Sequence, residues 1–432
     1  MELTVHPARH LRASFQVPGD KALSHRAAIL LALSRKGGRI RGYSSAADAA
    51  STLAALKALG AGVRRTGEEV VLAGGGREGF QAPEGTIHCA NSGSTLRMLA
   101  GVLAACPFET RLDGDGSLRR RPMERVAEPL RLMGASVDCE GESGRPPLRV
   151  KGGELTGIAY RPPVPSAQVK TAILLAALGA QGMTSVEEAL PTRDHTERML
   201  RFLGVEVGME GGVEGPALYV RGPATLDGGG DLEIPGDPSS AAFFLCAAAG
   251  REGSLVTVRG LCLNPGRIGF VAVLRRMGAS VAVRQTGMTG GEPVGEIEVE
   301  GRALKGTFIP AAEVPSLIDE LPALAVAATQ ALGETRVAGA SELRLKESDR
   351  ISALVAGLRA MGARIEGTDD GFVVQGSARL KGAAVDSAGD HRIAMALAMA
   401  GTLVAEGESL VRGAECIAVS LPEFEALLAQ AV

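Results

Sequence analysis

The chain contains 432 residues, of which 45% are hydrophobic and 22% are charged, and its formal net charge is −3. This length is enough to bury large apolar cores and predicts two domains. The near-neutral charge, the lack of Trp and a total of only ten Phe and three Tyr argue against a surface that binds nucleic acid through basic and aromatic side chains. We therefore expect no nucleic acid partner.

The six cysteines form no C-x-x-C pair and no spacing typical of metal ligands, which indicates a reducing compartment and no metal site. The first 18 residues contain no apolar segment of the kind found in secretory signals. The longest apolar runs are shorter than the roughly 18 to 20 residues that a membrane span needs. We expect a cytoplasmic protein with no membrane partner.

The first predicted helix follows a strand that ends at Val17 and a turn at Pro18-Gly19. It continues to Leu33, and its first turn carries Lys21 and Arg26. A helix N-terminus offers unpaired backbone N–H groups and the positive end of the helix dipole, so it attracts anions. Taken alone, this segment is more typical of a solvated basic turn, but the chain repeats the arrangement, and the repetition favours an anion site.

A short phrase, Leu-x-x-Leu/Met-Gly, recurs along the chain. Its glycines lie 74, 70, 74 and 84 residues apart, at Gly60, Gly134, Gly204, Gly278 and Gly362. Each phrase predicts the end of an amphipathic helix that is stopped by a C-terminal Gly and followed by a short β-branched strand.

A second series of helices is apolar on all sides and begins with polar residues that are able to cap a helix. These segments are Lys21–Leu33, Asn91–Ala105, Ser166–Leu178, Pro238–Ala249, Ile318–Ala331 and Asp390–Leu403. Together the two series define a repeat of roughly 70 to 80 residues, which consists of a buried helix, a strand, an amphipathic helix that ends in Gly, and two strands.

The sixth repeat is cut short, because the chain ends soon after its second helix. The N-terminal segment offers spare strands, at residues 3–5 and 13–17, so we expect it to complete the sixth repeat. This arrangement predicts one discontinuous domain of residues 1–17 and 235–432, and a second domain of residues 18–234. The burial of the apolar helices predicts an α/β fold with helices inside and sheets outside. If the helix N-termini of two such domains face each other, the cleft between them attracts small polyanions.

The helix entries carry cations, hydroxyls and carboxylates. Arg forks, Lys charges and hydroxyls recognise phosphates and carboxylates, and a carboxylate beside a cation is suited to proton transfer. Several of these groups have simpler interpretations. Arg193-Asp194 and Asp349-Arg350 are candidates for surface ion pairs, Asn91 and Ser166 for helix caps, His25 and His195 for structural hydrogen bonding, and Cys106 for a core thiol.

The motifs together resemble a known family. They are Pro18-Gly-Asp-Lys-x-x-Ser-His-Arg26, Asn91-Ser-Gly-x-Thr-x-Arg97, Arg121-Pro-Met, Ser166-Ala-Gln-Val-Lys170, Arg193-Asp-His-Thr-Glu197, Leu345-Lys-Glu-Ser-Asp-Arg350 and Asp390-His-Arg392. In this order they resemble the 5-enolpyruvylshikimate-3-phosphate synthases, and within them the bacterial class II branch. The resemblance implies two domains, each of three βαβαββ units, that close over the substrates in the cleft.

The resemblance also implies an activity, which is transfer of the enolpyruvyl group of phosphoenolpyruvate to the 5-hydroxyl of shikimate 3-phosphate with release of phosphate. No cofactor or metal is implied, and we expect a monomer. The residues expected to bind phosphoenolpyruvate are Lys21, Asn91, Gly93, Arg121, Gln168, Arg350 and Arg392. Those expected to bind shikimate 3-phosphate are Lys21, Ala22, Arg26, Ser166, Ala167, Gln168, Arg193, Asp319 and Lys346. The expected catalytic groups are Lys21, Asp319 and Glu347.

Two positions depart from the pattern of the family. Ala22 stands where the family usually has a Ser that helps to bind shikimate 3-phosphate, which removes a hydrogen bond of about 1 kcal/mol. Val419 stands where many members have a Lys that contacts phosphoenolpyruvate. We expect an active enzyme with a lower affinity for phosphoenolpyruvate.

Two alternative functions remain open from the sequence. The first is the related enolpyruvyl transferase that acts on UDP-N-acetylglucosamine, which has Asn after the active-site Lys and uses a Cys as an acid; here Ala22 follows Lys21, and the nearest candidate is Cys106. The second is a non-catalytic protein that binds anions. The presence of Lys21, Asp319 and Glu347 together argues against it, because binding alone needs no acid and base.

Overall fold

The computed structural model describes residues 1–212 and 215–432. By the contacts between its residues the chain divides into two compact units. Unit 1 contains Met1–Pro18, Pro235–Gly287 and Pro293–Val432, and unit 2 contains Gly19–Ile234 and Met288–Glu292. These units differ from the predicted domains at Pro18, which belongs to unit 1, and in the short segment 288–292, which belongs to unit 2. The division into two independent domains stays a prediction.

Each unit repeats one arrangement of strands. In one repeat of unit 2, β6 (Ile87–His88) is parallel to β7 (Glu109–Asp113), and β7 is antiparallel to β9 (Arg145–Lys151). The edge strand β8 (Ser136–Gly141) pairs with β9. The sheets β10-β11-β13-β12 and β18-β19-β21-β20 follow the same order. This repetition confirms the predicted α/β fold class.

The remaining elements of unit 2 fill the same pattern. They are α1 (Lys21–Leu33), β3 (Gly37–Arg41), α2 (Ala47–Ala58), β4 (Val63–Thr66), β5 (Glu69–Ala73), η1 (Arg77–Gly79), α3 (Gly93–Leu103), η2 (Leu118–Arg120), α4 (Glu124–Leu132), β10 (Ala159–Tyr160), α5 (Ala167–Ala177), β11 (Gly182–Glu187), α6 (His195–Phe202), β12 (Val207–Gly211), β13 (Pro216–Gly222) and β14 (Gly230–Glu233).

Unit 1 has the corresponding elements. They are β1 (Glu2–Val5), β2 (Arg12–Gln16), α7 (Pro238–Ala249), β15 (Leu255–Cys262), α8 (Gly269–Met277), β16 (Ser280–Thr289), β17 (Glu292–Glu300), β18 (Phe308–Ile309), η3 (Val314–Ser316), α9 (Leu321–Gln330), β19 (Glu334–Val337), η4 (Ser341–Leu345), α10 (Arg350–Ala360), β20 (Arg364–Thr368), β21 (Gly371–Gln375), β22 (Ala384–Asp386), α11 (His391–Thr402), β23 (Ser409–Arg412), η5 (Ala414–Val419) and α12 (Phe424–Ala431).

Strands from distant parts of the chain complete three of the sheets. In unit 2, β14 pairs in parallel with β3 and so serves as the first strand of the first repeat. In unit 1, β1 pairs antiparallel to β23 of the sixth repeat, as predicted for the N-terminus. The prediction is wrong for β2, which pairs in parallel with β15 of the fourth repeat.

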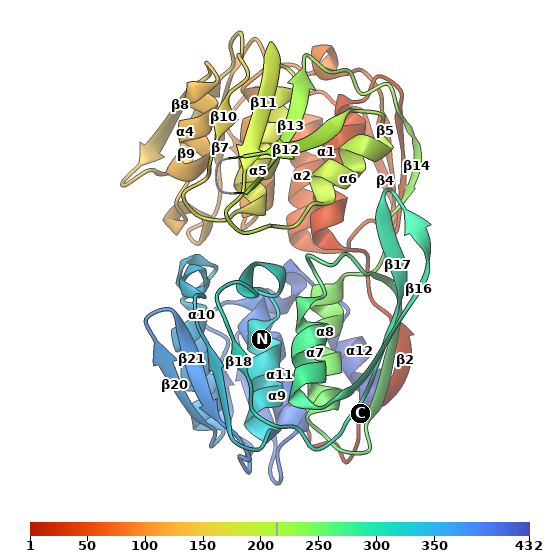
Figure 1. The fold of residues 1–432 in the computed structure, drawn as a ribbon, viewed down its shortest axis with the longest axis vertical. Coiled ribbons are helices and arrows are strands. Elements are labelled where there is room, and N and C mark those ends of the chain that lie inside the picture. The colour runs from red at the N-terminus through yellow and green to blue at the C-terminus, as the bar shows by residue number, and fades with distance from the viewer. Residues whose placement is uncertain (213–214) are drawn as a thin grey trace. The chain divides into compact units, whose positions relative to one another are not determined.

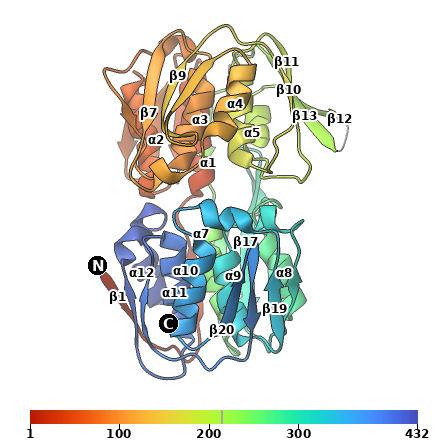
Figure 2. The same ribbon diagram turned by 90° about the vertical axis from the view of Figure 1, so that its left-hand side faces the viewer.

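The helices of the apolar series are buried and the sheets lie toward the periphery of each unit (Figures 1 and 2). All six predicted apolar helices are observed, and α1 and α7 have the predicted bounds. Small residues let these helices approach closely. A Cβ atom added to Gly101 of α3, for example, would lie 2.1 Å from the carbonyl oxygen of Ala172 in α5.

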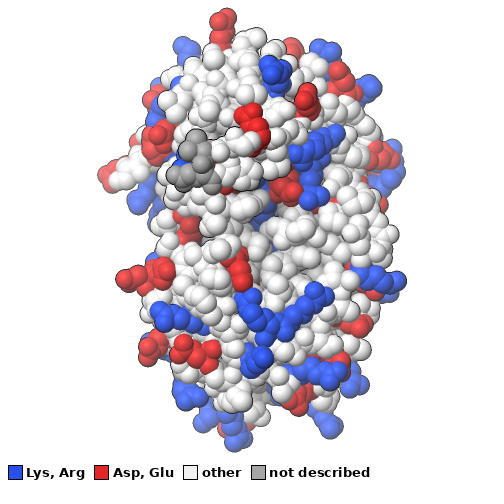
Figure 3. All heavy atoms as spheres, viewed as in Figure 1, with Lys and Arg blue, Asp and Glu red and all other residues white. Residues whose placement is uncertain are grey.

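The amphipathic helices end as predicted. The glycines of the Leu-x-x-Leu/Met-Gly phrase have φ angles of 86° to 114°, a left-handed conformation that costs Gly little and other residues more. Among the described residues, every helix is too short or too polar to span a bilayer. On the face shown in Figure 3, basic and acidic side chains are interspersed, which agrees with the small net charge.

Candidate active site

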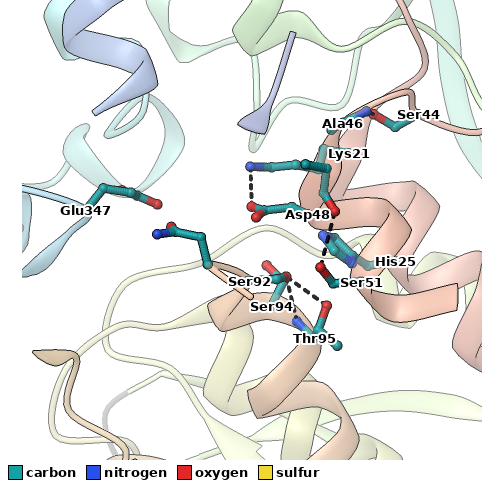
Figure 4. A network of polar contacts seen from close by, with 12 residues as sticks. Lys21, His25, Ser44, Ala46, Asp48, Ser51, Ser92, Ser94, Thr95 and Glu347 are labelled. Carbon is teal, nitrogen blue, oxygen red and sulfur yellow. Dashed lines mark hydrogen bonds and ion pairs between the residues drawn. The ribbon is translucent and has the colours of Figure 1, made fainter. Parts of the chain in front are cut away.

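The first cluster of predicted site residues lies at the start of α1 in unit 2. Asp20 caps this helix by accepting a hydrogen bond from the Leu23 backbone N–H at 2.8 Å. Lys21 points toward Asp48 of α2, and its Nζ atom lies 2.8 Å from Asp48 Oδ2 (Figure 4). Ala22 follows in the same turn. The carboxylate of Asp48 therefore holds a cation at the end of an inner helix.

A second cluster surrounds the start of α3. Ser92, rather than Asn91, caps the helix by accepting from the Thr95 backbone N–H at 3.1 Å (Figure 4). Asn91 instead accepts a hydrogen bond from Arg121 at 2.6 Å and donates one to Asp115 at 2.8 Å. The side chain of Asn91 thus positions the guanidinium of Arg121.

Gly93 leaves room for two guanidinium groups. A Cβ atom at this position would lie 2.7 Å from Arg97 NH1 and 3.2 Å from Arg121 NH1. Arg97 also donates to Gln168 Oε1 at 2.5 Å, and Gln168 donates to Ser94 Oγ at 2.9 Å. The entries of α3 and α5 are therefore joined through Gln168.

The residues expected to bind shikimate 3-phosphate occupy the starts of α5 and α6 and the first turn of α1. Ser166 caps α5 by accepting from the Val169 backbone N–H at 3.4 Å, and Ala167 is the first residue of that helix. Arg193 lies in the loop two residues before α6. Arg26 is buried and donates to Thr196, to Thr171 and to the Ala22 carbonyl at 2.8, 3.0 and 2.9 Å.

His25 is the first residue in a buried chain of hydrogen bonds. Its Nδ1 atom lies 2.6 Å from Thr52 Oγ1, Thr52 lies 2.7 Å from Thr95, and Thr95 lies 2.7 Å from Ser92. Burial, together with the charges of Lys21 and Arg26, holds the pKa of His25 well below its usual value of 6.5. His25 is therefore neutral at pH 7, in agreement with its interpretation as a structural residue.

The predicted catalytic carboxylates lie in unit 1, around the guanidinium of Arg350. Its Nε atom is 2.8 Å from Asp390 Oδ2, its NH1 atom is 3.3 Å from Asp319 Oδ1, and its NH2 atom forms an ion pair with Glu347. Only 2% of the Arg350 side chain is exposed. Burial opposes the charge of Arg350, but the three carboxylates outweigh it and raise its pKa. A permanent cation therefore holds Asp319 and Glu347 together.

Arg392 and Lys346 complete this cluster. Arg392 is the second residue of α11, with its Nε atom 3.6 Å from Asp319 Oδ1 and its NH1 group donating to the Asp319 carbonyl at 3.2 Å. Loss of hydration, assisted by Arg350, lowers the pKa of Lys346, while Asp319 and the neighbouring glutamates oppose that change.

The structure thus gathers the predicted residues into clusters within each unit. Asp48, and the role of Asp390 as a partner of Arg350, were not predicted from the sequence. The buried cluster of Lys170, Glu188 and Glu197 was not predicted either. Of these only Asp48 and Glu188 lie outside the recognised motifs, and no feature of the sequence around them indicates a partner.

Comparison with solved structures identifies the class of fold. The enolpyruvyl transferase NikO from Streptomyces tendae matches with a TM-score of 0.76 and 18% identity, covering 100% of this chain and 97% of that chain. The fold is therefore that of the enolpyruvyl transferases. EPSP synthase from Acinetobacter baumannii matches with a TM-score of 0.87 and 41% identity, covering 100% of this chain and 98% of that chain.

The sequence comparisons identify the family within that class. The model of EPSP synthase (3-phosphoshikimate 1-carboxyvinyltransferase) matches residues 5–428. The 3-phosphoshikimate 1-carboxyvinyltransferase of Roseiflexus sp. (strain RS-1) is 45% identical, covering 100% of this chain and 99% of that protein. That of Acidithiobacillus ferrooxidans (strain ATCC 53993 / BNL-5-31) is 47% identical, covering 99% and 97%. The chain belongs to the EPSP synthase family.

Proposed function

We propose that the protein transfers the enolpyruvyl group of phosphoenolpyruvate to the 5-hydroxyl of shikimate 3-phosphate and releases inorganic phosphate, as a step of the shikimate pathway to aromatic amino acids. Membership of the EPSP synthase family supports this reaction. The observation that carries it for this chain is the convergence of Asp319, Glu347 and Asp390 on the buried guanidinium of Arg350. Binding of anions alone would not require these carboxylates.

The binding roles follow from charge and donor type. Phosphoenolpyruvate carries a phosphate and a carboxylate, which guanidinium forks bind through two hydrogen bonds each. In the proposal Lys21, Arg121, Arg350 and Arg392 hold these groups, and Asn91, Gly93 and Gln168 also contact phosphoenolpyruvate. Shikimate 3-phosphate meets the hydroxyl and backbone N–H groups at the start of α5. The segment Ser166–Gln168, together with Lys21, Ala22, Arg26, Arg193, Asp319 and Lys346, forms its proposed site.

The proposed chemistry is addition followed by elimination. Asp319 takes the proton of the 5-hydroxyl as its oxygen attacks C2 of phosphoenolpyruvate, while Glu347, which enters this step as the protonated carboxylic acid, donates its proton to C3. In the second step the carboxylate of Glu347 takes a proton back from C3 and the bond between C2 and the phosphate oxygen breaks. Lys21 donates a proton to the leaving phosphate and is reprotonated with the hydroxyl proton that Asp319 took. A positioned acid and base of this kind contributes about 10²- to 10⁴-fold to the rate.

The alternative function, transfer to UDP-N-acetylglucosamine, requires a cysteine that acts as an acid. The nearest candidate, Cys106, gives this alternative little support. Cys106 is buried, and burial raises the pKa of its thiol to about 11. A thiol of this kind is a poor partner for proton transfer with a substrate. The cytoplasmic location, the monomeric state and the class II assignment stay predictions.

The proposal is tested by following phosphate release with phosphoenolpyruvate and either shikimate 3-phosphate or UDP-N-acetylglucosamine. We expect release only with shikimate 3-phosphate. In Glu347→Gln we expect kcat to fall by about 10²- to 10⁴-fold with the Kd for shikimate 3-phosphate little changed. Glu425→Gln, which alters an exposed carboxylate of α12, is the matched control. Release with the nucleotide sugar alone, or with neither acceptor, would reject the proposal.

A further inference from the structure

The buried cation Lys170 takes no part in the proposed chemistry. Its side chain is 1% exposed, and its Nζ atom lies 2.7 Å from Glu188 Oε2 and 2.7 Å from Glu197 Oε1. Burial disfavours the charged ammonium, but the two carboxylates reverse this effect and raise the pKa of Lys170. The cluster is therefore ionised within the interior of unit 2.

The three residues lie next to two segments that we expect to bind shikimate 3-phosphate. Lys170 is one helical turn after Ser166 and donates its backbone N–H to the Ser166 carbonyl at 3.0 Å. Glu197 lies in the first turn of α6, shortly after Arg193. Glu188 accepts a hydrogen bond from Thr192, which precedes Arg193, and Lys170 Nζ lies 3.5 Å from the Thr192 carbonyl.

A layer of hydroxyl groups joins the same helices to α1. Thr171 of α5 and Thr196 of α6 lie 2.7 Å apart, and both accept hydrogen bonds from Arg26. Thr171 also donates to the Ala167 carbonyl at 2.7 Å, within the Ser166–Gln168 segment. The polar contacts therefore link the entries of α1, α5 and α6, which are the proposed shikimate 3-phosphate segments of unit 2.

Lys170 itself is not placed to bind the substrate. An ammonium has three N–H donors, and those of Lys170 face Glu188, Glu197 and the Thr192 carbonyl. Stability alone also explains the cluster poorly, because a buried ion pair is often no more stabilising than apolar side chains of similar volume. The geometry of the cluster is better suited to fixing the relative positions of two segments.

We propose that Lys170, Glu188 and Glu197 form a positioning cluster that holds the Ser166–Gln168 segment and Arg193 in register and thereby sets the affinity for shikimate 3-phosphate. This inference rests on the proposed function. It differs from a general structural role in one measurable way, because it predicts a larger effect on shikimate 3-phosphate than on phosphoenolpyruvate. The proposed site of phosphoenolpyruvate includes only Gln168 of this segment.

Two variants of the full-length protein test the inference. In Glu197→Gln the amide keeps an oxygen that accepts from Lys170 and removes one charge, so we expect a folded protein with a KM for shikimate 3-phosphate raised about threefold or more. In the triple variant Lys170→Met/Glu188→Gln/Glu197→Gln no buried charge is left unpaired. Here we expect the KM for shikimate 3-phosphate and its calorimetric Kd to rise about tenfold, since a displacement of about 1 Å can cost up to 10²-fold.

The KM for phosphoenolpyruvate and kcat at saturating shikimate 3-phosphate should change less than about threefold in both variants, and Tm should stay close to that of the wild type in Glu197→Gln. The matched control is Glu140→Gln, which removes a carboxylate shared by Arg111 and Arg149 on an outer sheet of the same unit. It should leave all of these constants unchanged.

Several outcomes would overturn the inference. An unchanged KM for shikimate 3-phosphate in Glu197→Gln would do so, whether or not the triple variant folds. Equal increases for both substrates would indicate a general structural role instead. Failure of the wild type to release phosphate with shikimate 3-phosphate would reject the proposed function itself, whereas release by the wild type together with unchanged variants rejects only the positioning role.

Discussion

The two units hold the arginines near their proposed sites in different ways. In unit 2, Arg97 and Arg121 donate to the amide oxygens of Gln168 and Asn91, which bind a guanidinium without neutralising it. In unit 1, Arg350 is surrounded by three carboxylates and Arg392 lies beside one of them. The guanidinium groups that donate to amide oxygens are suited to binding an anion. The carboxylates that surround Arg350 are suited to proton transfer beside a fixed cation.

Similar arginines in repeated positions therefore need not have the same role. Arg97 and Arg392 lie near the starts of the inner helices α3 and α11, whereas Arg121 and Arg350 lie at or shortly before the starts of the amphipathic helices α4 and α10. The side chain that accepts from the guanidinium then decides whether the site retains its positive charge. Each of the following predictions tests this contrast.

The largest effect is expected from Arg350→Ala. Removal of this cation leaves Asp319, Glu347 and Asp390 close together without their shared partner, and the loss of one partner of a buried ion pair costs about 3–5 kcal/mol. We expect Tm to fall clearly and phosphate release to be abolished. Arg359→Ala in the same helix is the control for loss of a helical Arg. If Tm is unchanged in Arg350→Ala, the carboxylates do not depend on this cation.

Arg121→Ala should show the opposite pattern. Arg121 donates to the neutral side chains of Asn91 and Ser117, which are only partly buried, so we expect Tm to change by only a few degrees. Because a phosphate-binding fork is lost, kcat/KM for phosphoenolpyruvate should fall about 10²- to 10³-fold. Arg120→Ala, at the adjacent exposed position, is the control. A loss of Tm as large as that in Arg350→Ala would remove the contrast between the units.

Gly93→Ala should have a smaller effect. The new Cβ would lie 2.7 Å from Arg97 NH1 and 3.2 Å from Arg121 NH1, and both groups are the ends of flexible side chains that are able to move. We expect KM for phosphoenolpyruvate to rise about tenfold while the protein stays folded. At Gly116 an added Cβ meets its nearest atom at 3.9 Å, so Gly116→Ala should leave KM unchanged. Equal behaviour of the two variants would contradict this interpretation.

His25 of unit 2 lies one helical turn from Lys21, but we expect it to take no part in proton transfer. Because its folded-state pKa lies well below 6.5, the unfolded chain takes up a proton as the pH falls through about 6.5 and the folded chain does not. The free energy of unfolding should therefore fall below pH 6.5, by up to about 1.4 kcal/mol per pH unit. Denaturant titrations of His25→Asn should lack this contribution, and its kcat should keep the pH profile of the wild type. A shifted profile would bring His25 into the chemistry.

The smallest expected effect is a gain of binding in Val419→Lys. This position, in η5 of unit 1, lacks the Lys that many family members have, and a new cation should strengthen the grip on phosphoenolpyruvate. We expect its KM to fall a few-fold, in keeping with an exposed charge worth about 0.2–1 kcal/mol. Ala418→Lys, at the exposed neighbouring position, is the control. An unchanged KM in Val419→Lys would show that this departure has no consequence for binding.

Local signals in the sequence were enough to predict the repeat. The ends of α1 and α7 follow from uniformly apolar segments with polar caps, and the glycine stops appear as residues of positive φ. The pairing of β2 was predicted wrongly, because its partner β15 lies more than 200 residues away and nothing local distinguishes it from β23.

The same distinction applies to the site. The cations at helix entries were visible because charged residues beside a buried helix are unusual. Their partners were harder to predict, since Asp48 and Glu188 reach Lys21 and Lys170 only through the packing of neighbouring elements. Sequence reasoning therefore predicted which residues gather at each helix entry, whereas the structure was needed to find which carboxylate or amide holds them.

The order in which the chain is synthesised gives the strand exchange a further consequence. Unit 2 lacks the edge strand of its first sheet until β14 has been made, and the N-terminal strand β1 waits for β23, at residues 409–412. At about 5–20 residues per second, the ribosome needs roughly 20–80 s to reach that point. During this time the strand of unit 1 with which β1 pairs has not yet been synthesised. Unit 2 is thus able to finish folding first, and the first strand made is among the last to find its place.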